Sequence, residues 1–217
     1  MAEEALVACL CRNGLLAFCK YLANCFAYSD FIRNFAAKNI ALMIIEVENI
    51  KNGLPGVAPV TAAHLYESFM CCMHYHSHNE TTLLSLSGYE QPVTLKWRDY
   101  YDAQISRTYT DEQYNTEHGA VCLSIMLTLS LTPYTVIMRS RKGTGFDYWL
   151  GIKDTVLFQK KARLEASGIL KGDDRLMDKR YKAKSLQTQK SDDSGLPAYI
   201  SIVEFSRPKA IFKKKEL

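Results

Sequence analysis

Three acidic residues in the second half of the chain have the types and spacing of a divalent-metal site. Asp147 follows Gly143-Thr144-Gly145-Phe146, Glu165 lies 18 residues later, and Glu117 precedes both. A separation of 18 residues accommodates two antiparallel strands and a loop, so the two later carboxylates can meet at one end of a sheet. Paired carboxylates are costly without a cation between them, and Mg²⁺ prefers oxygen ligands. The pattern predicts Asp147 and Glu165 as ligands of Mg²⁺ or Mn²⁺, with Glu117 as an auxiliary acid or third ligand.

Each acid also has an ordinary structural interpretation. An Asp beside glycines is often a turn or capping residue, a strand Glu can pair with a neighbouring Arg or Lys, and a Glu early in a helix can interact with the helix dipole. The combination favours chemistry because strand alternation places Arg163, Glu165 and Ser167 on one face. The opposite face of the same strand is small and apolar, as packing against a helix requires.

The elements that must position these acids follow from the residues around them. Thr110-Asp111-Glu112 predicts the start of a helix over 113–129, because Asp111 can cap it and the segment becomes increasingly apolar. Pro133 ends that helix. The next elements are predicted as strands over 134–138, 146–150 and 161–167, a charged helix over 173–190, and a strand over 198–205 that Pro208 ends.

The first part of the chain has a different character. Apolar residues at helical spacing predict helices over 5–48 and 61–73, with a loop at 52–59 between them. Short β-prone runs over 82–86 and 93–97 predict a hairpin. We therefore expect three regions. They are a mainly helical N-terminal region with a hairpin (1–97), an α/β core (98–212) and a basic tail (213–217).

The order of elements and acids resembles the active-site layout of the PD-(D/E)XK nuclease superfamily, over residues 111–205. The residues that carry it are Glu117, the segment Gly143-Thr144-Gly145-Phe146-Asp147, and Glu165-Ala166-Ser167. In that family a helix supplies an acid, a glycine-led second strand supplies an Asp, and the third strand supplies Glu or Asp, a spacer and usually Lys. The resemblance implies a restriction-endonuclease-like core, a mixed central sheet flanked by helices, and metal-dependent hydrolysis of DNA phosphodiester bonds.

The chain departs from the family pattern at Ser167, where the family normally has lysine. A serine hydroxyl is a poor substitute for a lysine that orients water and stabilises the transition state. In this superfamily a residue of the following helix can take that role, which makes Lys179, Lys182 and Lys184 candidates, with Lys182 preferred as the catalytic one. The remaining candidates are expected to bind substrate; they are Ser167, Arg163, Gln187, Lys179 and Lys184.

Charge and composition indicate the partner and the compartment. Residues 139–217 hold 19 Lys and Arg and 10 Asp and Glu, a net charge of +9, whereas residues 1–138 have a net charge of −5. A basic C-terminal third favours a polyanion such as DNA. Seven cysteines without a repeating frame indicate reduced thiols and a cytoplasmic protein, and no segment has the apolar length of a membrane span.

Two functions of different classes remain open at this point. The first is a metal-dependent DNA nuclease, which the resemblance places in microbial defence against foreign DNA; an RNA-directed nuclease has the same sequence features. The second is a catalytically inactive nuclease-fold subunit that acts in nucleic-acid binding or protein assembly, which Ser167 favours. In either case the helical N-terminal region is expected to dock a protein partner or a second copy of the chain.

Overall fold

The computed structural model describes residues 43–88, 93–152 and 159–215. All of them belong to one compact unit. The helix expected over 5–48 lies largely outside the described residues. Its last part is corrected, because Met43–Glu46 form strand β1 and Val47–Asn52 a 3₁₀ helix, η1. β1 pairs in parallel with Val93–Lys96, a contact that local helical spacing does not reveal.

The strands of the described residues form one mixed, eight-stranded sheet in the order β1-β3-β2-β8-β7-β6-β5-β4. The strands after β1 are β2 (Thr81–Ser87), β3 (Val93–Lys96), β4 (Tyr134–Arg139), β5 (Tyr148–Ile152), β6 (Ala162–Ile169), β7 (Ala198–Glu204) and β8 (Lys209–Lys215). β2 and β3 are antiparallel, as the expected hairpin requires. β4, β5 and β6 form an antiparallel meander, and β7 returns parallel to β6.

The last strand, β8, was not expected from the sequence. Lys213–Lys215, predicted to lie in a basic tail, form its C-terminal end and pair with Ala198–Ile200 of β7. On its other side β8 pairs in parallel with β2. The hairpin of the N-terminal region and the predicted core therefore share one sheet, and the boundary expected at residue 97 falls between strands of that sheet.

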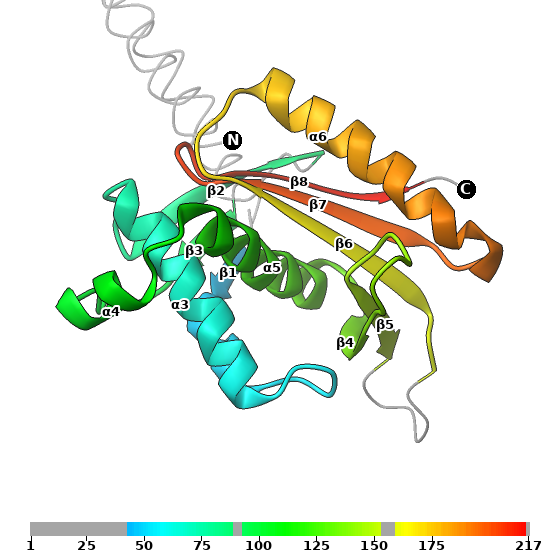
Figure 1. The fold of residues 1–217 in the computed structure, drawn as a ribbon, viewed down its shortest axis with the longest axis horizontal. Coiled ribbons are helices and arrows are strands. Elements are labelled where there is room, and N and C mark those ends of the chain that lie inside the picture. The colour runs from blue at the N-terminus through cyan, green and yellow to red at the C-terminus, as the bar shows by residue number, and fades with distance from the viewer. Residues whose placement is uncertain (1–42, 89–92, 153–158, 216–217) are drawn as a thin grey trace, which may run out of the picture. The chain divides into compact units, whose positions relative to one another are not determined.

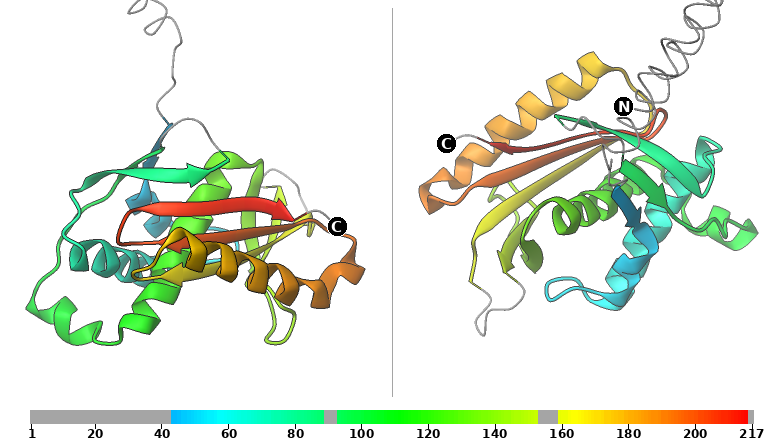
Figure 2. Two further views of the ribbon diagram at one scale, coloured as in Figure 1. Left: turned by 90° about the horizontal axis from the view of Figure 1, so that it is seen from above. Right: turned by 180° about the vertical axis from the view of Figure 1, so that it is seen from behind.

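Helices cover both faces of the sheet. They are α3 (Pro59–Tyr75), the short α4 (Ala103–Thr108), α5 (Glu112–Leu131) and α6 (Asp174–Gln187), which a 3₁₀ helix, η2 (Thr188–Ser194), extends. α5 packs on β6 and β7 from one face with α3 against it, whereas α6 packs on β7 and β6 from the other (Figures 1 and 2). Within the described residues no helix combines the length and the apolar character needed to cross a membrane.

The edge of β6 that faces β5 is paired over only part of its length, and its unpaired part is called the free edge below. β5 pairs with β6 only at residues 162–164, whereas β7 pairs with it over 163–169. Beyond Leu164, the backbone of β6 therefore has a sheet neighbour on one side only. The α5 side of this stretch is closely packed, because a Cβ on Gly168 would lie 2.2 Å from the Thr116 carbonyl oxygen. The free edge is where the sequence places Glu165 and Ser167.

The turn before β5 approaches the end of α6, and Gly145 makes that approach possible. Its φ is +85°, and a Cβ there would lie 2.2 Å from the Gln187 carbonyl oxygen. We expect Gly145→Ala to lower the free energy of unfolding by about 2 kcal/mol or more, because left-handed strain adds to a backbone clash. Thermal unfolding measures the loss as a fall in Tm.

Gly143 provides the matched control for this substitution. It has a φ of +98°, but a Cβ there would meet no atom within 4 Å. Gly143→Ala is therefore expected to cost only the conformational strain, about 1 kcal/mol. An equal loss of Tm in the two variants would show that the approach of the turn to α6 does not limit this position.

Candidate active site

Asp147 is held at the free edge of β6 by backbone hydrogen bonds. Its N–H donates to the Leu164 carbonyl (2.9 Å), which continues the β5–β6 ladder by one residue. Its carboxylate Oδ2 accepts from the backbone N–H of Ala166 (2.9 Å), a group that β5 would have used had the ladder continued. Because the ladder ends at Leu164, the Ala166 N–H donates to the Asp147 carboxylate and orients it. Burial raises the pKa of Asp147 against the opposing effect of that hydrogen bond.

Glu165 lies next to Asp147 and is almost completely buried, with 1% of its residue surface exposed. Its Oε1 accepts from Lys184 Nζ at 2.6 Å and from Gln187 Nε2 at 3.1 Å. Its Oε2 is buried and receives no hydrogen bond from the described residues. Burial, together with the neighbouring negative charge of Asp147, raises the pKa of Glu165 to about 7.

The carboxylate pair fits a divalent cation. A buried acceptor without a donor, beside a second carboxylate, is an arrangement that only a proton or a cation relieves. Mg²⁺ and Mn²⁺ bind carboxylate oxygens of this kind and keep positions for water and phosphate oxygens. Asp147 and Glu165 are the residues that would hold the ion. The described residues contain no group of three or more His, Cys, Asp and Glu side chains with ligand geometry.

Asp147 of the pair borders a cavity of about 390 Å³ that is lined by residues of α3, α5 and α6, whereas Glu165 is not among its lining residues. Asp147 lines it, together with Ser167 of β6 and Lys184 of α6. The other charged or titratable residues of its lining are Arg139, Arg180, Glu117, His64, His118, Tyr114 and Tyr148. A cavity that combines the half-buried carboxylate of Asp147 with three cationic side chains suits an anionic ligand that also binds a metal ion.

The structure separates the lysines that the sequence left as alternatives. Lys184 contacts Glu165, and its side chain is only 22% exposed. Lys182, the residue preferred from the sequence, is exposed, as is Lys179. Neither of the two lines the cavity. Gln187 accepts from Lys184 Nζ (3.3 Å) and thereby joins the same cluster.

Ser167 and Arg163 share a strand face with Glu165, as expected, but have different surroundings. Ser167 lines the cavity and accepts from Arg180 NH1 at 3.2 Å. Arg163, which the sequence predicted to bind substrate, is 0% exposed and is not among the residues that line the cavity. Its guanidinium donates to the Leu196 and Thr188 carbonyls and to side chains of η2, so it holds the segment after α6 against β6.

Glu117 lines the cavity but does not join the carboxylate pair. It is exposed on α5 and accepts from Gln113 Nε2 at 3.1 Å. The sequence placed it correctly on the first half of a helix that faces β6, because Asp111 caps that helix by accepting from the Tyr114 N–H (3.0 Å). A role as third ligand stays a prediction.

Several cavity residues were missed from the sequence. Arg180 is four residues before Lys184, so helical spacing alone was a usable signal for it. Arg139 follows the predicted strand over 134–138 directly. His64 lies on α3, in the region assigned to the N-terminal part. No local sequence pattern connects it with Asp147, which is 83 positions away, or with the later residues of the site.

The pKa of Glu165 makes the stability of the metal-free protein depend on pH. A carboxyl whose pKa is raised in the folded state stabilises the fold at low pH, and that contribution is lost as the pH rises through about 7. Between pH 5 and pH 8 in EDTA, we expect wild type to lose about 2 to 3 kcal/mol more stability than Glu165→Gln. Denaturant unfolding at both pH values measures the difference.

Glu117→Gln is the matched control, because it neutralises an exposed acid of the same cavity. It is expected to keep the wild-type pH dependence. Adding Mg²⁺ or Mn²⁺ at 100 times its Kd should return about 2.7 kcal/mol to wild type at pH 8 by mass action, and far less to Glu165→Gln. The assignment of the buried acid is wrong if Glu165→Gln titrates like wild type.

Comparison of the chain with protein-family models, with curated proteins and with solved structures found no match. The chemistry of the cavity is therefore the basis for a functional assignment. That chemistry consists of the pair Asp147 and Glu165, the cation Lys184 in contact with it, and two arginines on the same lining.

Proposed function

We propose that the protein is a divalent-metal-dependent nuclease that hydrolyses phosphodiester bonds of DNA. The observation that carries the proposal is the meeting of Asp147, Glu165 and Lys184 at the free edge of β6, beside a cavity. Carboxylates with a raised pKa next to a lysine are typical of functional sites. Bound Mg²⁺ or Mn²⁺ would lower the pKa of water and neutralise charge that develops on the phosphoryl group.

The chain's own residues supply positioning and charge. The Ala166 N–H orients the Asp147 carboxylate, and Lys184 with Gln187 orients that of Glu165. The Lys184 ammonium also places a positive charge beside the pair, where it stabilises negative charge that develops on a phosphoryl oxygen. Lys184 therefore takes the role for which the PD-(D/E)XK pattern uses the lysine that is missing at Ser167.

Two arginines complete the electrostatics of the cavity. Arg139 ends β4, and Arg180 lies one turn before Lys184 on α6. Guanidinium groups bind phosphate oxygens in a bidentate manner, so these residues would fix the scissile phosphate and its neighbour. Ser167, whose hydroxyl accepts from Arg180, holds that guanidinium at the cavity.

The arrangement of elements also supports the proposal. The order α5-β4-β5-β6-α6-β7, with an antiparallel meander and a parallel return strand, agrees with the restriction-endonuclease-like core that the resemblance implies. The two helices lie on opposite faces of the sheet, as that core requires (Figure 1). A role in microbial defence against foreign DNA follows from the resemblance alone.

The test is a nuclease assay on supercoiled plasmid, linear duplex and single-stranded DNA, with Mg²⁺, Mn²⁺ or EDTA. We expect cleavage that requires the metal. Salt-sensitive DNA binding without cleavage by any metal would replace this proposal with the alternative, an inactive nuclease fold that binds nucleic acid. Absence of both cleavage and binding would exclude nucleic acid as the substrate and direct attention to a protein partner.

A further inference from the structure

One wall of the cavity is made of aromatic rings, and one of them, His64, comes from outside the expected nuclease core. His64 of α3 lies 5.4 Å from Tyr114 and 5.2 Å from His118, measured between ring centroids. Tyr114 and His118, on α5, are 4.0 Å apart. These three residues, called the ring wall below, line the same cavity as Asp147 and Lys184. The cavity therefore has a cationic and a ring-lined side.

His64 is held in one orientation by a chain of hydrogen bonds. The Tyr109 hydroxyl donates to Glu67 Oε2 at 2.6 Å, so its oxygen is left to accept from His64 Nδ1 at 3.0 Å. The Tyr109 ring also stacks on His64, with an angle of 16° between the planes. His64 thus carries its proton on Nδ1, and Nε2 is an acceptor.

The Nε2 atom of His64 lacks a hydrogen-bond partner among the residues that the structure describes. It is also buried. Burial, and then the charge of His118, lower the pKa of His64, which keeps the ring neutral and Nε2 an acceptor at neutral pH. A buried acceptor without a donor is destabilising, and a donor brought by a ligand is one means of satisfying it.

We propose that the ring wall binds one nucleobase of the substrate, with His64 Nε2 accepting a hydrogen bond from that base. The inference rests on the proposed function, since the base belongs to the nucleotide whose phosphate lies at Arg180 and Lys184. Aromatic rings stack on bases of any sequence. A base within a duplex is covered on both faces and reaches such a wall only when it is unpaired. The substrate is therefore a single strand, or a duplex with an unpaired nucleotide at the site.

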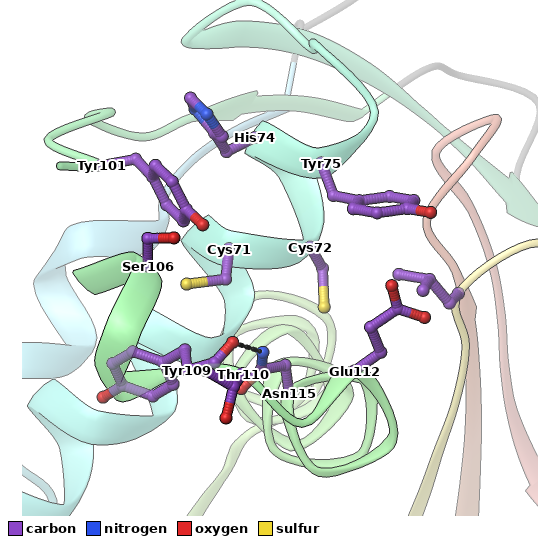
Figure 3. A pocket seen from close by; sticks show the side chains of 11 residues that line it. Cys71, Cys72, His74, Tyr75, Tyr101, Ser106, Tyr109, Thr110, Glu112 and Asn115 are labelled. Atoms are coloured by element: carbon purple, nitrogen blue, oxygen red, sulfur yellow. Dashed lines mark hydrogen bonds between the residues drawn. The ribbon is translucent and has the colours of Figure 1, made fainter. Parts of the chain in front are cut away.

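A second cavity, of about 360 Å³, is also lined by aromatic residues but, among the described residues, lacks the cationic side chains that the first cavity has beside the ring wall. Its lining includes the rings of His74, Tyr75, Tyr101 and Tyr109, together with Cys71, Cys72 and Glu112 (Figure 3). His74 there has a charged partner, because Nδ1 contacts Asp99 Oδ2 at 2.7 Å, and its ring stacks on Tyr101 at 4.0 Å. The described residues of this lining include no Lys or Arg, so it offers a phosphate no partner.

The test compares two fluorescently labelled eight-nucleotide DNA strands in EDTA, one normal and one with abasic sugars at every position. Fluorescence anisotropy gives both Kd values for the same protein. We expect wild type to bind the base-bearing strand at least about tenfold more tightly, because stacking on one base contributes that much. His64→Ala and Tyr114→Ala should reduce the preference toward unity and leave the Kd of the abasic strand unchanged.

Tyr114→Ala keeps the test interpretable if His64→Ala does not fold. Because 44% of the Tyr114 surface is exposed, its replacement is expected to leave the core intact. His74→Ala is the matched control on the same helix and is expected to keep the preference. Equal affinity of wild type for the two strands, or tighter binding of a duplex than of the normal strand, would overturn the inference while the proposed nuclease stands. Binding of neither strand would instead defeat the proposed function. An RNA strand of the same sequence identifies which sugar the site accepts.

Discussion

Asp147→Asn is expected to remove metal-dependent DNA cleavage, with a fall in rate of at least about 10³-fold. The substitution keeps the side chain's size and its acceptor for the Ala166 N–H but removes one of the two charges that would hold the ion. Metal ions contribute several kcal/mol of transition-state stabilisation, and each 1.36 kcal/mol corresponds to a factor of ten in rate. The measurement is single-turnover cleavage of a labelled DNA with Mg²⁺ or Mn²⁺, and Glu165→Gln should behave in the same way.

The matched control for this loss is Asp178→Asn. Asp178 is exposed on α6, close in sequence to the site residues, and is absent from the cavity lining. It should retain wild-type rates, and all three variants should keep a cooperative unfolding transition. Because two adjacent carboxylates with raised pKa values are destabilising without metal, Asp147→Asn is expected to unfold at a higher temperature than wild type in EDTA. Cleavage by Asp147→Asn at a rate within tenfold of wild type would refute the two-carboxylate site.

Lys184→Ala is expected to reduce cleavage about 10²- to 10³-fold, the effect typical of removing one preorganised charge from the reacting centre. Its Nζ contacts Glu165 Oε1 at 2.6 Å, and no other lysine lines the cavity among the described residues. The loss should appear in the single-turnover rate at saturating metal. Metal affinity should rise slightly or stay constant, because Lys184 repels a cation and competes for Glu165.

Lys182→Ala separates this assignment from the one that the sequence favoured. Lys182 is exposed on the same helix, two residues from Lys184, and therefore points to a different side of α6. Its replacement should change the rate less than about threefold, in line with a solvated side chain. If Lys182→Ala were the defective variant and Lys184→Ala the active one, the structure's choice of lysine would be wrong.

There is a physical reason why the sequence did not identify Lys184 as the lysine that contacts Glu165. The inward face of a helix is recognised from its apolar stripe, and α6 has almost none, since Met177 is its only fully buried residue. Arg180 and Lys184 lie three and seven residues after Met177 and so share its side of the helix. That spacing was present in the sequence, but the three lysines of this helix, Lys179, Lys182 and Lys184, all lie among mostly polar residues. The sequence pattern therefore did not show which of them faces the sheet.

The acids were easier to find because local structure determines their relation. Alternation along β6 separates Glu165 and Ser167 from the small residues that face α5, and glycines before β5 place Asp147 at a strand start. The same alternation also put Arg163 beside Glu165. It did not predict that η2 would cover Arg163, which depends on how the chain returns after α6.

The sequence by itself determined the order of elements from α5 to β7 and the two acids on adjacent strands, because propensity, capping and alternation act over a few residues. The tertiary structure decided that β5 stops pairing at Leu164, that Lys184 contacts Glu165, and that α3 brings His64 to the cavity. These are contacts between segments far apart in the chain. They depend on where one element ends against another, and no periodicity within either element encodes that position.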